Sequence, residues 1–164
     1  GKSLQDKDRF NLARELKERA KKIGSRIILP VDFMAGDAFS EKAQTKVLTA
    51  EEFSDPWMAL DIGPKTIELY VETLKKMKTV VWNGPMGVFE MKPFAKGTHA
   101  IANAVANLDA TTVVGGGESA AVVDQMGIGD KFSHVSTGGG ASLEMLEGMI
   151  LPGVTILSDK EEIH

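Results

Sequence analysis

Two glycine triplets follow apolar runs that read as strands, and both could bind a phosphate group through the backbone. Residues 115–120 read GGGESA, and residues 136–144 read STGGGASLE. A helical pattern starts directly after each triplet, so free N–H groups and the positive end of the helix dipole point at the same place. A tight turn that only lets the helix pack closely is the alternative for each triplet. Because the arrangement recurs, the pair favours one anion held from both sides.

Glu118 and Ser119 lie at the start of the helix predicted after the first triplet. A carboxylate beside a phosphate requires a cation between the two charges, and Mg²⁺ commonly takes one or two carboxylates together with phosphate oxygens. Glu118 is therefore a predicted magnesium ligand, although a glutamate that stabilises the helix dipole has the same position. Ser119 could contact phosphate or cap the helix.

A third segment, residues 82–90, reads WNGPMGVFE and forces an irregular loop after a predicted strand. Its apolar members could support a planar ring. Asn83 could donate hydrogen bonds to phosphate oxygens, and Glu90 could accept them from ribose hydroxyls, which suits an adenosine nucleotide. As the structural alternative, Asn-Gly-Pro is simply a strong turn.

The elements that must position these loops begin with a helix over residues 8–23, ended by Gly24. Residues 26–31 predict a strand buried on both faces, and Asp32 follows it. Residues 33–56 read mostly as loop, with a short strand at 46–49. A helix is expected from Pro64. Its predicted buried stripe consists of Ile67, Tyr70, Leu74 and Met77.

Strand and helix then alternate through the rest of the chain. Strands are predicted at 79–82, 111–114 and 133–136, with His134 buried, and helices at 94–108, from 118 or 119, and at 141–147. Such alternation favours right-handed βαβ units. We expect an α/β fold with a doubly wound parallel sheet, a Rossmann-like three-layer αβα architecture. Ligands bind at the carboxyl ends of such strands, where Asn83, Gly115 and Gly138 fall.

Composition restricts the classes of function. The 164 residues are 43% hydrophobic and 26% charged, which suits one globular domain. The net charge of −4 is of mixed sign and argues against nucleic acid or anionic membrane as a partner. No signal peptide or long apolar run occurs, so a cytoplasmic location is expected. The absence of cysteine excludes disulfides and thiol catalysis.

The three loop segments, in their order and spacing, resemble phosphoglycerate kinase. Supporting matches are LPVD at 29–32, LDIGP at 60–64 and LPGV at 151–154, so the resemblance covers almost the whole chain. It implies reversible phosphoryl transfer from 1,3-bisphosphoglycerate to ADP, giving 3-phosphoglycerate and magnesium ATP in glycolysis. It also implies that the intact enzyme is a monomer.

The resemblance assigns roles to single residues. It implies that Leu60, Pro85, Gly87 and Val88 contact adenine, that Glu90 contacts the ribose, and that Asn83 contacts the phosphate chain. The backbone amides of the two triplets would face the transferring phosphoryl group; these residues are Gly115, Gly116, Gly117, Gly138 and Gly139, with Ser119 beside them. The family usually has aspartate at the position of Glu118, so the metal role is expected here with a shifted distance.

The resemblance also implies what the chain does not contain. Residues 1–164 correspond to part of the carboxy-terminal nucleotide-binding domain. The amino-terminal domain, whose basic patch holds 3-phosphoglycerate, and the phosphate-binding lysines early in the second domain are expected to be absent. We therefore expect this polypeptide alone to be inactive.

Three other functions compete with this interpretation. GGGESA also fits the loose dinucleotide fingerprint of an NAD-dependent dehydrogenase, but residues 134–137 lack the carboxylate expected at the next strand end. The opening GKS could be the end of a Walker phosphate loop, but the residues after it form a solvated segment. A non-catalytic binding module is the third possibility.

Overall fold

The structure is a computed structural model that describes residues 1–157. The chain divides into two compact units. Gly1–Glu72 and Met86–Ile101 form unit 1, and Thr73–Pro85 with the chain from Ala102 onward form unit 2. Among the described residues, each unit holds one three-stranded sheet.

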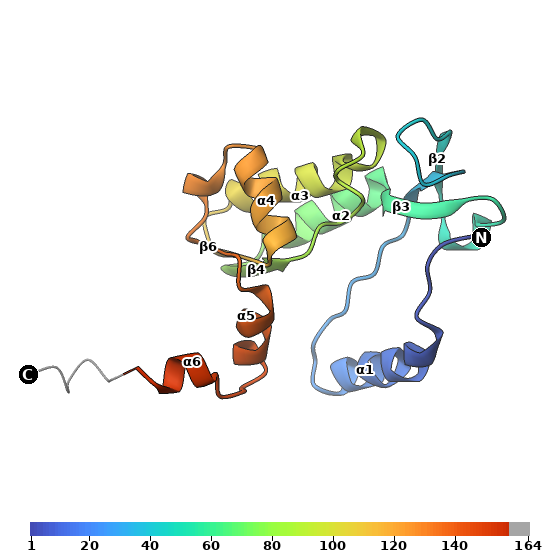
Figure 1. Ribbon diagram of the computed structural model, residues 1–164. Coiled ribbons are helices and arrows are strands. Elements are labelled where there is room, and N and C mark those ends of the chain that lie inside the picture. The colour runs from blue at the N-terminus through green and yellow to red at the C-terminus, as the bar shows by residue number, and fades with distance from the viewer. Residues whose placement is uncertain (158–164) are drawn as a thin grey trace, which may run out of the picture. The chain divides into compact units, whose positions relative to one another are not determined.

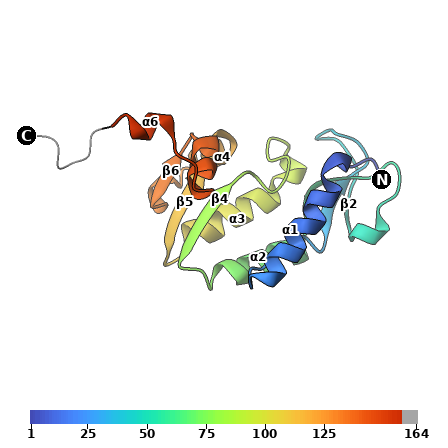
Figure 2. The ribbon, with the colours of Figure 1, turned by 90° about the horizontal axis from the view of Figure 1, so that it is seen from below.

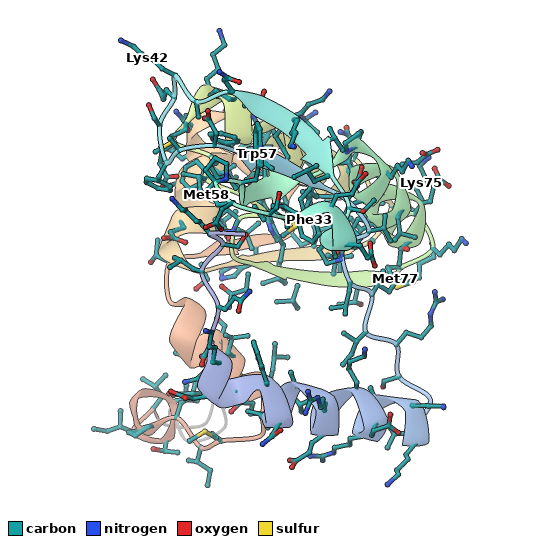
Figure 3. The ribbon with its side chains drawn as sticks, turned by 90° about the vertical axis from the view of Figure 1, so that its right-hand side faces the viewer. Phe33, Lys42, Trp57, Met58, Lys75 and Met77 are labelled. Carbon is teal, nitrogen blue, oxygen red and sulfur yellow. The ribbon has the colours of Figure 1, made fainter. Side chains whose placement is uncertain are left out.

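Unit 1 contains an antiparallel sheet that follows the 3₁₀ turn η1 (Lys7–Arg9) and helix α1 (Phe10–Lys22). The strands are β1 (Phe33–Gly36), β2 (Thr45–Leu48) and β3 (Met58–Ile62), in the order β2-β1-β3 (Figure 1). Phe33 packs edge-on against Phe53 with ring centroids 5.7 Å apart, and the Lys46 ammonium lies 4.2 Å from the centre of the Trp57 ring. Phe33 and Trp57 are labelled in Figure 3. The sequence predicted β2, but it placed β1 in a loop and predicted no strand at β3.

The predicted strand over residues 26–31 is wrong, because none of these residues is in a strand. Ile27, Leu29 and Val31 are about half exposed. A strand needs a neighbour to pair with its backbone, and no strand in the described part of the chain pairs with this segment. Individual hydrogen bonds hold the segment instead, such as the one that the Tyr70 hydroxyl donates to the Ile28 carbonyl at 3.2 Å.

Helices α1 and α2 form where they are expected, but the stripe predicted to be buried in α2 is not fully buried. α2 (Pro64–Leu74) begins at Pro64, and its one buried residue is Thr66. α1 has no buried residue. Met77, expected on the buried stripe, is 40% exposed. The spacing of apolar residues thus predicted the helices correctly and their environment incorrectly.

Unit 2 contains the parallel sheet. Its strands are β4 (Thr79–Asn83), β5 (Thr111–Gly115) and β6 (His134–Ser136), in the order β4-β5-β6, and Figure 2 shows them side by side. The later helices are α4 (Gly117–Gln125), α5 (Gly139–Leu146) and α6 (Pro152–Thr155), with the turn η4 (Gly129–Lys131) before β6. α3 (Lys96–Ala106), preceded by η3 (Lys92–Phe94), begins in unit 1 and ends in unit 2.

The predicted α/β class with a parallel sheet is confirmed, but two strand environments differ from expectation. β4 buries one face through Val80 and Trp82, while Val81 is 41% exposed. His134 in β6 is exposed, not buried. Between residues 1 and 157, no helix is both long and apolar enough to cross a membrane.

Candidate functional site

The carboxyl ends of the three parallel strands in unit 2 lie in register. Asn83 pairs with Gly115, and Gly115 pairs with Ser136. The three predicted loops therefore begin at one edge of the sheet, as the sequence predicted.

The two glycine triplets are in direct contact. The Gly116 N–H donates to the Ser136 carbonyl at 3.0 Å. Gly139 is buried, and a Cβ placed on it would lie 2.5 Å from Gly116 Cα and 2.7 Å from Gly116 N. No side chain fits there without moving backbone, so close packing requires glycine at position 139. For Gly139, the alternative that the glycine allows close packing therefore applies.

Asn83 lies where the triplets meet. A Cβ on Gly116, whose φ is +94°, would lie 2.7 Å from Asn83 Oδ1, and a Cβ on Gly139 would lie 3.3 Å from the same oxygen. Asn83 itself is exposed. Both triplets therefore approach the exposed side-chain amide of Asn83 at the end of β4.

Backbone N–H groups at the starts of α4 and α5 remain outside the helical hydrogen bonds. The first helical bonds run from Ala120 N to Gly116 O at 3.0 Å and from Ser142 N to Gly138 O at 3.1 Å. The amides of residues 117–119 and 139–141 precede these bonds. A Cβ on Gly117 or Gly140 would meet no atom within 4 Å, so there is open space beside both helix starts.

Two other amides of the triplets already have partners within the protein. The Gly116 N–H is bonded to Ser136 O, and the Gly138 N–H donates to the Ser136 hydroxyl at 3.1 Å. The amides that are left without a partner in the described part of the protein are therefore those of residues 117–119 and 139–141, in the first turns of α4 and α5.

Ser119 is fully buried, and its hydroxyl accepts a hydrogen bond from Gly84 N at 2.7 Å. It does not cap α4, whose N-cap is Gly116 and lacks a side-chain hydrogen bond. Ser119 therefore connects the start of α4 to the loop after β4, which favours a positioning role over a phosphate contact.

Glu118 is exposed in the first turn of α4. Within residues 1–157, no group of three or more histidine, aspartate or glutamate side chains gathers in a way that could hold a metal alone. A single carboxylate next to open space and free amides fits an Mg²⁺ ion whose other ligands are phosphate oxygens and waters.

The loop at residues 86–91 belongs to unit 1 and contains three of the residues predicted to bind nucleoside. Val88 N donates to Leu60 O at 2.8 Å, and Met91 N donates to Val88 O at 3.0 Å. Glu90 is exposed. The Leu60 side chain is 8% exposed, and a Cβ on Gly36 would lie 2.8 Å from its Cδ1, so this side chain packs in the core. Pro85 belongs to unit 2.

Asp61, which was not among the predicted site residues, is 3% exposed at the end of β3. Its Oδ1 accepts from its neighbour Ile62 N at 2.8 Å, and its Oδ2 accepts from Gly97 N at 2.6 Å. Burial raises the pKa of Asp61 from 3.8 to about 6, even though both hydrogen bonds lower it. An acidic residue followed by Ile-Gly-Pro at a strand end was the available signal.

Two cavities lie away from the predicted residues. One, of about 210 Å³ in unit 1, is lined by Met34, Val47, Asp61, Ile62, Pro64, Ile67, Pro93 and Lys96. The other is an open depression of about 600 Å³ in unit 2, where Val123, Phe132 and His134 are among the lining residues. Since His134 begins β6, this depression lies at the amino end of that strand, not at its carboxyl end.

Comparisons with known proteins cover nearly the whole chain. The family model described as phosphoglycerate kinase matches residues 1–149. The phosphoglycerate kinase of Clostridium novyi (strain NT) is 55% identical over 162 residues, which are 98% of this chain and 40% of that protein. The phosphoglycerate kinase of Chloroflexus aurantiacus (strain ATCC 29366 / DSM 635 / J-10-fl) is 54% identical over 164 residues. The chain thus spans about 40% of the length of these relatives.

Solved structures agree with the sequence comparisons. Phosphoglycerate kinase from Coxiella burnetii superposes with a TM-score of 0.89 and 40% identity, over 95% of this chain and 40% of that one. The enzyme from Pyrococcus horikoshii OT3 superposes with a TM-score of 0.75 and 35% identity, over 91% of this chain and 36% of that one. The dehydrogenase alternative is not favoured by any of these matches.

Proposed function

Because this chain belongs to the phosphoglycerate kinase family, we propose that it forms part of the carboxy-terminal, nucleotide-binding domain of such an enzyme. The complete protein reversibly transfers a phosphoryl group from 1,3-bisphosphoglycerate to ADP, giving 3-phosphoglycerate and ATP. In this proposal the protein is a cytoplasmic monomer, and 3-phosphoglycerate binds to an amino-terminal domain outside residues 1–164.

The observation that supports the proposal most is the meeting of three loops at the carboxyl edge of the parallel sheet. Asn83, Gly116 and Gly139 approach within a few ångströms there. The free amides of two helix starts open beside them and suit the negative charge of a nucleotide polyphosphate. Charge that develops on a transferring phosphoryl group is stabilised by donors that are already in place.

Each group at this edge has a proposed task. The amides of residues 117–119 and 139–141 donate to phosphate oxygens, and Asn83 donates through its side-chain amide. Glu118 holds Mg²⁺, which neutralises phosphate charge when it is bound. Ser119 fixes the loop after β4 through Gly84 N.

The nucleoside is assigned to the loop after residue 84. We place adenine against Pro85, Gly87 and Val88, with Glu90 accepting hydrogen bonds from the ribose. The buried Leu60 supports this loop through its carbonyl, which accepts from Val88 N at 2.8 Å. Its proposed contact with adenine therefore depends on the small exposed part of its side chain.

Calorimetry on the complete gene product tests this function. Magnesium ADP should bind with a one-to-one stoichiometry, and NAD should not bind. Removal of Mg²⁺ with EDTA should weaken ADP binding, and Glu118→Gln should reduce the size of that magnesium effect. Saturable binding of NAD without any response to ADP would overturn the proposal.

A further inference from the structure

We infer that Thr98 and Asp61 are positioning residues that hold the loop at residues 86–91 in its binding conformation and thereby set nucleotide affinity without contacting nucleotide. The effect on affinity rests on the function proposed above. The positioning itself rests only on contacts within unit 1.

Thr98 is fully buried in the first turns of α3. Its hydroxyl oxygen accepts hydrogen bonds from two consecutive backbone groups of the loop, Met86 N at 3.0 Å and Gly87 N at 3.2 Å. A hydroxyl oxygen has two lone pairs, so one atom satisfies both donors. Without it, two neighbouring N–H groups in a half-buried loop lose their partner, and a buried donor without a partner is costly.

Asp61 lies directly beneath the same loop. A Cβ on Gly87 would lie 2.6 Å from Asp61 Cγ, and a Cβ on Gly97 would lie 2.9 Å from that carbon. The carboxylate therefore occupies the space that a side chain at position 87 or 97 needs. Glycine at position 87 is required by this buried acid, whatever the loop binds.

The two residues act on the loop from different elements. Asp61 is at the end of β3, and its Oδ2 accepts from Gly97 N at 2.6 Å, next to Thr98 in the chain. The β3 carbonyl of Leu60 adds a third support through Val88 N. The loop is thus held before ligand arrives, which lowers the entropic cost of binding.

The test compares Thr98→Val with Thr98→Ser in the complete gene product. Valine keeps the shape of threonine and removes the acceptor, whereas serine keeps the acceptor. Thr98→Val should raise the Kd of magnesium ADP about tenfold, in line with the loss of one buried hydrogen-bonded group. The KM for 3-phosphoglycerate should stay unchanged, and Thr98→Ser should restore most of the nucleotide affinity.

Amide hydrogen exchange measures, without any ligand, how firmly the loop at residues 86–91 is held. In Thr98→Val, peptides that cover residues 86–91 should exchange faster than in the wild type, while peptides that cover β5 should not change. Should Thr98→Val fail to fold, Asp61→Asn serves instead. In this variant the side-chain NH₂ group must face one of the two backbone N–H groups that donate to the carboxylate, so one hydrogen bond is lost. Faster exchange in residues 86–91 and a higher Kd for magnesium ADP are therefore expected, as for Thr98→Val.

The outcomes separate the two proposals. Unchanged exchange in residues 86–91, or faster exchange without a change in the ADP Kd, overturns the inference. An equal loss in Thr98→Ser and Thr98→Val also overturns it. If the wild type binds no magnesium ADP, the proposed function fails, and the exchange data alone decide whether Thr98 positions the loop.

Discussion

Asp61 accepts a hydrogen bond on each carboxylate oxygen, which stabilises its negative charge. It is also almost completely buried, which destabilises that charge. Burial has the larger effect and raises its pKa to about 6. Because this folded-state pKa is above the ordinary value of 3.8, the folded protein binds a proton more tightly than the unfolded chain does.

The stability that Asp61 contributes should therefore be fully present below about pH 3.8 and lost as the pH rises through about 6. We predict that the melting temperature of the wild type, relative to that of Asp61→Asn, falls between pH 5 and pH 7.5. Thermal unfolding of both proteins in matched buffers measures this difference. A difference that stays constant or rises over this range contradicts the assigned pKa.

The sequence alone predicted some features of single site residues and missed others. Asn83 and Glu118 are exposed, and the roles assigned to them from the sequence stay predictions. Ser119 was identified, but the direction of its hydroxyl was not, because its partner Gly84 N is 35 residues away in the chain. Asp61 was missed for the same reason, because its partner Gly97 N is 36 residues away. Thr98 was missed because nothing local indicates that its hydroxyl accepts from Met86 N and Gly87 N.

At the scale of elements, the turns between strands and helices determine the candidate site. The sequence predicted the strands of the parallel sheet and the helices after them to within a few residues, because apolar spacing and glycine punctuation are local signals. It placed a strand at residues 26–31 and missed β1. Strand formation depends on a pairing partner elsewhere in the chain, which the pattern of one segment does not contain.

The contact between the two triplets leads to a matched pair of substitutions in one helix. Gly139→Ala places a methyl group against the Gly116 backbone and should destabilise the fold by about 1–3 kcal/mol. Gly140→Ala meets no atom within 4 Å and should be neutral or stabilising by up to about 1 kcal/mol. Urea unfolding of the two variants measures both values. Equal stabilities would show that the triplets do not touch.

Asp32 caps helix α2 from outside the helix. Its Oδ2 accepts from Lys65 N at 3.0 Å, and its Oδ1 accepts from Thr66 N and the Thr66 hydroxyl, both at 2.7 Å. Burial acts to raise its pKa, but these hydrogen bonds outweigh it and hold the pKa below 3.8. The charged carboxylate is thus the form that stabilises the fold.

Asp32→Ala should cost about 2 kcal/mol of stability at pH 7, the upper range for loss of a helix cap. Since the folded-state pKa is lowered, this contribution is present above pH 3.8 and is lost as the pH falls further. The difference in unfolding free energy between the wild type and Asp32→Ala should therefore narrow below pH 3.8. At pH 7, Asp32→Asn should lose less stability than Asp32→Ala. Denaturant unfolding across this pH range is the measurement, and a gap that widens in acid would refute the capping role.

At the scale of the whole molecule, the chain spans about 40% of the length of its relatives. Several apolar side chains in the described part are more than half exposed, among them Leu29 at 54%, Leu146 at 65% and Ile150 at 80%. Single exposed apolar side chains are normal on a protein surface, so these values alone do not mark an interface.

We predict that residues 1–164, expressed alone, do not turn over 3-phosphoglycerate and ATP, because the proposed function assigns the acceptor side of the reaction to a domain outside them. A coupled assay that follows ADP production measures this, with the complete gene product as the positive control. Turnover by the isolated chain at a rate comparable to that of the complete protein would contradict the proposed division of tasks.

The three loops at the carboxyl edge of the parallel sheet are proposed to bind a nucleotide polyphosphate. The most direct measurement is an NMR titration of the ¹⁵N-labelled protein with magnesium ADP. The amides of residues 117–119 and 139–141 and the side-chain amide of Asn83 should show the largest shifts, and inorganic sulfate should move the same backbone signals less. Saturable binding with the shifts confined to other residues, or no shift at all, would contradict the account.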